Sequence, residues 1–202
     1  CKKAYPTAGV KIFLLGILKD EIRSLLERFR NEKLVEADWQ VYENQFEDIK
    51  QRRSTCNSLR FLIDPKYYEG YSYVMIRDID FIVLPHKESH ASYFSRRVKK
   101  MNTCYFVVRG PYKTPRRPKI NRRGWKGEFT RIAGGMVFLK NPDWFKKTKK
   151  MRRYYLKLLK ESKHDKYDKH VPCSYREYDE VMLYRICKKS KLPVPKRRQK
   201  AP

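Results

Sequence analysis

The first half of the chain alternates short apolar runs with amphipathic segments. Val10–Leu18 is an apolar run typical of a buried strand, and Asp20–Arg30 has apolar residues at helical spacing with charges between them. Asp38–Tyr42 alternates toward a second strand, and a helix with a basic face is predicted over 46–62. This alternation predicts an α/β domain, in which a mostly parallel central sheet is flanked by helices.

Two further apolar runs surround a pair of carboxylates. Tyr73–Ile76 and Phe81–Leu84 read as strands, and Asp78 and Asp80 stand between them with one residue in between. On extended backbone, residues two apart face the same side, so the two carboxylates lie together. Such a pair is costly to bury without a cation, and its oxygens suit Mg²⁺ or Mn²⁺. The alternative is a turn with two solvated carboxylates.

The second half of the chain predicts two strands, two helices and a long basic loop. Thr103–Arg109 and 129–139 read as strands, and the loop over 110–127 between them is rich in Pro, Lys and Arg. A strongly basic helix is predicted over Trp144–Lys160, with Asn141 as its cap. A last helix is expected to end near Lys189. The candidate buried residues of the basic helix are Phe145, Tyr154, Leu158 and Leu159.

Paired glycines precede the apolar part of the strand predicted over 129–139. Gly134 and Gly135 lack a Cβ atom, which allows another group to approach the backbone closely. That group is either a ligand or another segment of the chain. A bulge or tight bend explains the pair equally well.

Composition indicates one folded domain with an unusual charge. The 202 residues suffice for one hydrophobic core, which we assign to residues 1–195, with a basic tail over 196–202. From Leu192 onward no core residue is expected. The chain has 49 Lys and Arg against 22 Asp and Glu, a formal net charge of +27. Such a field attracts nucleic acid, an anionic membrane or a phosphorylated small molecule.

Cysteine usage and hydropathy restrict the class of protein further. The five cysteines include no Cys-x-x-Cys pair, so free thiols in a reducing compartment are expected instead of a zinc site or a disulfide framework. The longest apolar run, Val10–Leu18, is about half as long as a bilayer span and lacks a cleavage site for a signal peptide. We therefore expect no membrane span and a cytoplasmic protein.

Several motifs follow one another in a characteristic order. After the first strand and helix come Glu43-Asn44 with Asp48, then Arg60 on a helix, Asp78-Ile79-Asp80, Gly134-Gly135 and finally Asp179-Glu180. In this order the chain resembles the GT-A-fold glycosyltransferases, which use nucleotide sugars, over roughly residues 10–195. Its compact size resembles the glycosyltransferase domains encoded by large algal (chlorella) viruses.

The resemblance implies a role for each motif and a class of substrate. Asp78 and Asp80 would hold Mn²⁺ or Mg²⁺, and Asp179 and Glu180 would be the catalytic carboxylates beside the reacting carbon. The donor would be a nucleoside-diphosphate sugar, in particular a UDP-sugar, and the acceptor a hydroxyl of a glycan or glycoprotein. No stable nucleic-acid complex is expected. The residues implied in binding the nucleotide sugar are Leu15, Glu43, Asp48, Arg60, Arg77, Asp78, Gly134 and Gly135.

Physical chemistry agrees with these roles. The leaving nucleoside diphosphate gains negative charge in the transition state, where a divalent ion and an arginine stabilise it most. One carboxylate takes the proton of the acceptor hydroxyl in an inverting transfer, or stabilises positive charge on the sugar in a retaining one. The sequence leaves open whether Asp179 or Glu180 does so.

Each motif also has a plainer explanation. Arg60 would be an ordinary surface arginine of a helix, and Glu43 and Asp48 would cap a loop. Asp179 and Glu180 would only complement the positive end of a helix dipole. A lone loop histidine such as His170 is more often a surface residue than a ligand, so it stays outside the metal set.

Two other functions remain open on the sequence alone. The charge of +27 suits a nucleic-acid-binding protein, in which aromatic residues interleaved with Lys and Arg over Lys146–Tyr155 would stack on bases. A metal-dependent nuclease or phosphotransferase would use the same pair, Asp78 and Asp80. That second alternative leaves Glu43 and Asp48 without a role.

Overall fold

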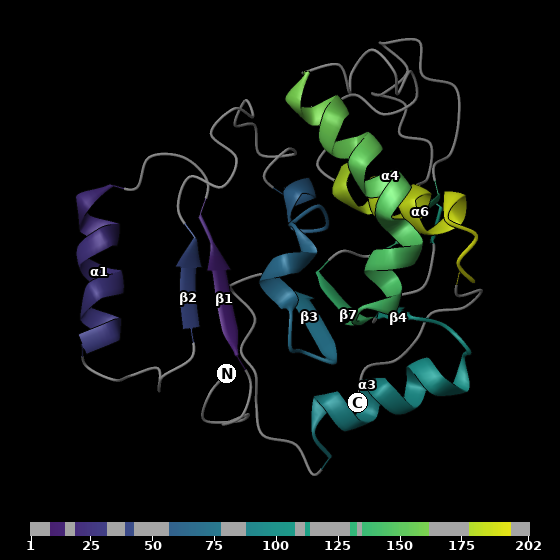
Figure 1. The fold of residues 1–202 in the computed structure, drawn as a ribbon, viewed down its shortest axis with the longest axis horizontal. Helices are drawn as coiled ribbons and strands as arrows, with labels where there is room; N and C mark the ends of the chain where they lie inside the picture. Colours follow the sequence, from purple (N-terminus) through teal and green to yellow (C-terminus); the bar gives the residue numbers. More distant parts are fainter. Residues whose placement is uncertain are drawn as a thin grey trace.

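The computed structural model describes residues 9–14, 19–31, 39–42, 57–77, 88–107, 112–113, 130–132, 135–161 and 178–194. These residues form a mixed α/β structure (Figure 1). The helices are α1 (Asp20–Asn31), α3 (His90–Lys100), α4 (Asp143–Lys160), α6 (Tyr178–Lys189) and the 3₁₀ helix η1 (Pro65–Tyr68). The strands are β1 (Val10–Phe13), β2 (Trp39–Tyr42), β3 (Tyr73–Arg77), β4 (Tyr105–Val107), β5 (Tyr112–Lys113), β6 (Thr130–Arg131) and β7 (Met136–Lys140).

The first three elements form the parallel unit that the sequence predicts. β1 and β2 pair in parallel, with Val10 opposite Trp39 and Phe13 opposite Tyr42, and α1 connects them. The apolar side chains of α1 are less buried than its periodicity predicts, because Ile22 is 45% and Leu25 41% exposed. The predicted helix is confirmed, although these two apolar side chains are exposed.

The larger sheet corrects the expectation of a mostly parallel sheet. Its order is β3-β7-β4, and β7 runs antiparallel to both neighbours. β3 and β4 consequently run in the same direction, with α3 between them in sequence and β7 inserted between them in space. Continuous apolar runs are typical of strands covered on both faces, and they do not encode strand direction. The sequence therefore predicts the strands but not their antiparallel pairing.

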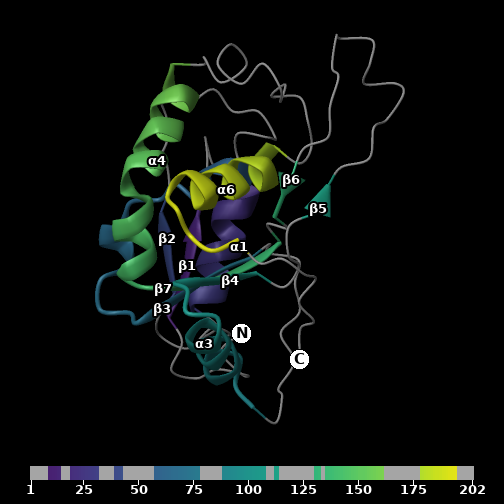
Figure 2. The same ribbon diagram turned by 90° about the vertical axis from the view of Figure 1, so that its right-hand side faces the viewer.

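Helices cover both faces of this sheet (Figure 2). Phe106 and Phe138 point to one face, where they pack against Phe94 and Val98 of α3. The alternate strand residues point to the opposite face and join the main core with α4 and α6. The strand residues on that opposite face are Val74, Ile76, Tyr105, Val107, Val137 and Leu139.

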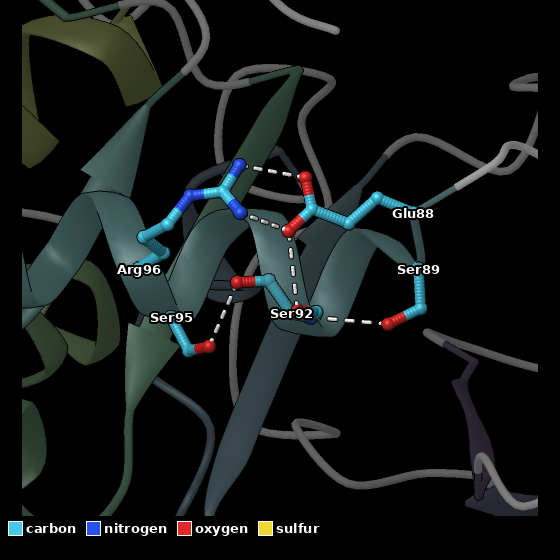
Figure 3. Close-up of polar contacts among 5 residues, drawn as sticks. All are labelled: Glu88, Ser89, Ser92, Ser95 and Arg96. Carbon is cyan, nitrogen blue, oxygen red and sulfur yellow. Dashed lines mark hydrogen bonds and ion pairs between the residues drawn. The ribbon is translucent and has the colours of Figure 1, made fainter.

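α3 is not among the elements that the sequence predicts, because its few apolar residues lie among polar and basic ones. Ser89 caps the helix by accepting a hydrogen bond from the Ser92 backbone N–H at 3.1 Å. Figure 3 shows Glu88 bound through both carboxylate oxygens to Arg96, at 2.5 and 2.7 Å. The signal that was available is the four-residue spacing of Phe94 and Val98 behind a serine cap.

α4 follows its prediction closely, with two corrections. Phe145, Leu158 and Leu159 are buried as expected, but Tyr154 is 45% exposed. Asn141 does not cap the helix. Its side-chain amide donates to the carbonyl oxygens of Tyr68 and Tyr71, both at 2.7 Å, and so ties the start of α4 to the segment before β3.

A buried arginine joins α4 to the segment over 57–63. Arg152 Nε donates to the carbonyl oxygen of Phe61 at 2.9 Å, and its Nη2 donates to that of Ile63. Its guanidinium also lies 4.8 Å from the centroid of the Phe145 ring. Burial lowers the pKa of Arg152 to about 10. These hydrogen bonds hold in place the turn that carries Arg60.

The last described residues contribute to the core, which corrects the expectation that no core residue follows from Leu192 onward. Leu192 is 6% exposed and lies in the main apolar cluster, against which Val194 packs. The Tyr105 hydroxyl donates to the carbonyl oxygen of Pro193 at 3.1 Å. Within the described residues, no helix is long and apolar enough to cross a membrane.

Cys104 and Cys187 are buried free thiols, and we expect both to resist alkylation in the folded protein. Burial raises the pKa of both thiols, that of Cys187 to about 12, and only the thiolate is nucleophilic. Mass spectrometry after a pulse of iodoacetamide should show labelling at least about 100-fold slower than in urea. Equal rates in buffer and urea would contradict this burial.

Candidate functional site

Several of the predicted motifs are adjacent in sequence to strand ends at one edge of the larger sheet. Arg77, the last residue of β3, lies opposite Met136, the first residue of β7, and Val107 at the end of β4 lies opposite Val137. The carboxyl ends of β3 and β4 and the amino end of β7 therefore share this edge. Along the chain, β3 leads directly into Asp78, and Gly135 directly precedes β7.

The first turn of α6 reaches the same edge. The backbone N–H of Ile132, four residues before β7 begins, donates to the carbonyl oxygen of Glu180 at 3.2 Å. Ile132 is fully buried, so this contact is enclosed by the core. Figure 2 shows α6 beside β6, the strand that ends immediately before Ile132. The turn that carries Asp179 and Glu180 is thereby anchored next to the segment that leads to the glycine pair.

Arg60 and Asp179 form a partly buried ion pair across 119 residues of sequence. Arg60 Nη2 donates to Asp179 Oδ2 at 2.5 Å, and the two side chains are 18% and 5% exposed. A buried carboxylate is strongly destabilising without a partner, so this contact fixes both side chains. The plainer explanation of Arg60, an ordinary surface arginine, is wrong. The structure brings together two residues to which the sequence assigned separate roles in one pocket.

The position of Arg60 is also set by its own segment. Its neighbours Leu59 and Phe61 are buried at 3% and 1% exposure, and its guanidinium carbon lies 5.0 Å from the centroid of the Phe61 ring. The Phe61 carbonyl is held in turn by Arg152. The guanidinium is therefore aligned both by the core beneath it and by Asp179 beside it.

The two adjacent carboxylates of α6 have different surroundings. Asp179 is 3% exposed and accepts from Arg60, whereas Glu180 is half-buried. Both lie in the first turn of the helix, where negative charge is favourable. Adjacent residues of a helix point about 100° apart, which allows one carboxylate to face the core and the other to face away.

Arg77 lies at the edge on the other face of the sheet. Along β3, Val74 and Ile76 are buried on the side of α4 and α6, and the partly buried residues alternate with them. Arg77 therefore shares its face with Tyr73 and Met75, which pack against the α3 cluster. It is close in sequence to Asp78, but it is not part of the contact between Arg60 and Asp179.

The remaining predicted site residues lie outside the described residues. They are Leu15, Glu43, Asp48, Asp78, Asp80 and Gly134. Within the described ranges, no group of three or more His, Cys, Asp or Glu side chains is arranged to hold a metal ion. Asp179 is bound by Arg60, so we do not add it to Asp78 and Asp80, which stay a prediction.

Comparison with known proteins adds no relative. No protein-family model matches the chain, and no significant match was found among curated proteins or among solved structures. The function therefore has to be inferred from the residues of this chain alone.

Proposed function

We propose that the protein is a metal-dependent glycosyltransferase of the GT-A type. It would transfer a sugar from a nucleoside-diphosphate sugar, in particular a UDP-sugar, to a hydroxyl of a glycan or glycoprotein. The observation that carries this proposal is the ion pair between Arg60 and Asp179. Glu180, the neighbour of Asp179, accepts a hydrogen bond from Ile132, four residues before β7, and the first residue of β7 pairs with Arg77, which precedes Asp78 in the sequence.

The proposed reaction breaks the bond between the anomeric carbon and the phosphate oxygen, and it forms a bond from that carbon to the acceptor oxygen. Asp78 and Asp80 would hold Mn²⁺ or Mg²⁺, which supplies positive charge to the diphosphate. Arg60 presents a second, fixed positive charge to the leaving phosphate. Preorganised charges of this kind stabilise the transition state because they need no rearrangement as negative charge develops.

The surroundings of the two carboxylates suggest a division of roles. Asp179 is buried and bound to Arg60, so protonating it would break the contact that aligns the guanidinium. We therefore assign Asp179 to positioning Arg60. Glu180 is half-buried, and it is the better candidate to take the acceptor proton or to stabilise positive charge on the sugar.

Two features of the fold agree with the expected order of strand, helix and strand, whereas the larger sheet departs from the mostly parallel sheet that we expect of the GT-A fold. β1, α1 and β2 form a parallel unit, and β3 and β4 run in the same direction with α3 between them in sequence. The antiparallel β7 between β3 and β4 is the departure. It nevertheless brings the segment after Gly135 to the carboxyl end of β3, where open α/β sheets bind their ligands.

We expect one nucleoside diphosphate, UDP or its sugar, to bind only when a divalent metal is present. Calorimetric titration of a panel of nucleotides with Mn²⁺, and then with EDTA, measures this directly. Metal-dependent binding of nucleotides that carry one particular base would support the proposal and identify the base of the donor. Flat traces from folded protein would contradict it, and release of nucleotides from an oligonucleotide in Mg²⁺ would favour a nuclease.

A further inference from the structure

α4 carries a continuous cationic stripe on its exposed side. Seven of its lysine and arginine side chains are exposed, and six of them fall within an arc of about 100° on a helix of 3.6 residues per turn. That arc lies directly opposite the buried side of the helix, which contains Trp144 and Leu159. The exposed cations are Lys146, Lys147, Lys149, Lys150, Arg153, Lys157 and Lys160.

Among the described residues, few acidic side chains lie along this stripe. The sequence of α4 and its flanks contains two carboxylates, one at each end. Asp143 pairs with Lys140 at 2.7 Å, and Glu161 pairs with Lys157 at 3.7 Å. Between them, like charges lie three and four residues apart, as at Lys146 and Lys150, and such pairs destabilise a helix. An anionic partner would relieve this repulsion along about 21 Å of the helix axis.

The shape of the stripe favours a flat partner over a nucleic-acid strand. α4 lies along the outer side of the molecule, so its exposed face is the convex surface of one helix (Figures 1 and 2). Proteins that bind single strands instead combine a basic groove with several stacking aromatic side chains. On this face Tyr154 is 45% exposed, whereas its neighbour Tyr155 is buried.

We propose that the exposed face of α4 docks on an anionic lipid bilayer. Clusters of four to eight Lys or Arg on a helix face suit phosphatidylserine-type headgroups. The apolar side chains of α4 are buried in the core, so the helix does not insert into the bilayer. Its attraction to the bilayer surface is electrostatic. Tyr154, with an apolar ring and a polar hydroxyl, suits the headgroup region. The docking surface does not depend on the proposed sugar transfer.

Cosedimentation with vesicles tests this surface. The full chain should bind phosphatidylcholine vesicles that contain phosphatidylserine and release them at high ionic strength, and it should not bind phosphatidylcholine alone. Neutralising four stripe cations should lower the partition coefficient by at least about 100-fold, since each contributes roughly a fivefold factor. The test variant combines Lys146→Gln, Lys150→Gln, Arg153→Gln and Lys157→Gln.

A matched control variant distinguishes the effect of the stripe from the effect of net charge. It removes four exposed cations of α3 and α6, namely Lys99→Gln, Lys100→Gln, Lys188→Gln and Lys189→Gln. We expect this control to keep its affinity within a few-fold, and both variants to keep the wild-type circular dichroism. Equal losses in the two variants would overturn the proposal. It would also fail if a single-stranded oligonucleotide, through the same four stripe cations, bound more tightly than the vesicles.

Discussion

Replacing Asp78 or Asp80 by Asn should lower sugar transfer by at least about 10³-fold, because each change removes a carboxylate from the metal that neutralises the leaving diphosphate. The same variants should lose metal-dependent binding of the nucleotide in calorimetry. Asn is nearly isosteric with Asp, so we expect the thermal unfolding midpoint to stay close to that of the wild type.

Asp20→Asn is the matched control for these two variants, because Asp20 is an exposed carboxylate in the first turn of α1. It should leave both turnover and nucleotide binding unchanged. If both Asp78→Asn and Asp80→Asn turned over the donor at the wild-type rate after removal of the metal, the proposed chemistry would be wrong.

Breaking the pair between Arg60 and Asp179 should affect both stability and nucleotide binding. Arg60→Ala removes an ion-pair partner from a carboxylate that is 5% exposed, which should lower the free energy of unfolding by about 3–5 kcal/mol. Urea denaturation measures this change. Asp179→Ala should cost a similar amount, and the double variant less than the sum of the two single variants.

An apolar replacement of the pair separates stability from function. Arg60→Met with Asp179→Leu removes both charges together and should be close to neutral in stability. Nucleotide affinity should nevertheless fall, because the guanidinium that we propose to bind the diphosphate is gone. Glu180→Gln should keep the stability and the nucleotide affinity while turnover is lost. Wild-type nucleotide affinity in the Arg60 variant would exclude Arg60 from the site.

The pair between Arg96 and Glu88 is the control for burial. It has the same 2.5 Å contact distance, but its side chains are 63% and 29% exposed. Exposed ion pairs contribute about 0–1 kcal/mol, so Arg96→Ala should change the free energy of unfolding little. A loss as large as that of Arg60→Ala would show that burial does not explain the difference.

Local patterns were sufficient wherever neighbouring residues decide the structure. The apolar spacing in α1 and α4 predicts both helices, and the order strand, helix, strand predicts the parallel pairing of β1 with β2. The same spacing did not fix which side chains of a helix are buried, because Tyr154 is exposed. α3 was missed because its apolar residues, Phe94 and Val98, are few among basic ones.

The sequence by itself determined the mixed α/β class, the cationic composition of α4 and the residue types that suit a metal and a diphosphate. Tertiary structure alone decided that β7 enters antiparallel between β3 and β4, and that Arg60 meets Asp179 across 119 residues. The reason is physical. Periodicity reports which side of an element is apolar, whereas strand direction and distant ion pairs depend on which remote segments the folded chain brings together. The same tertiary packing buries Asp179 and leaves its neighbour Glu180 half-buried.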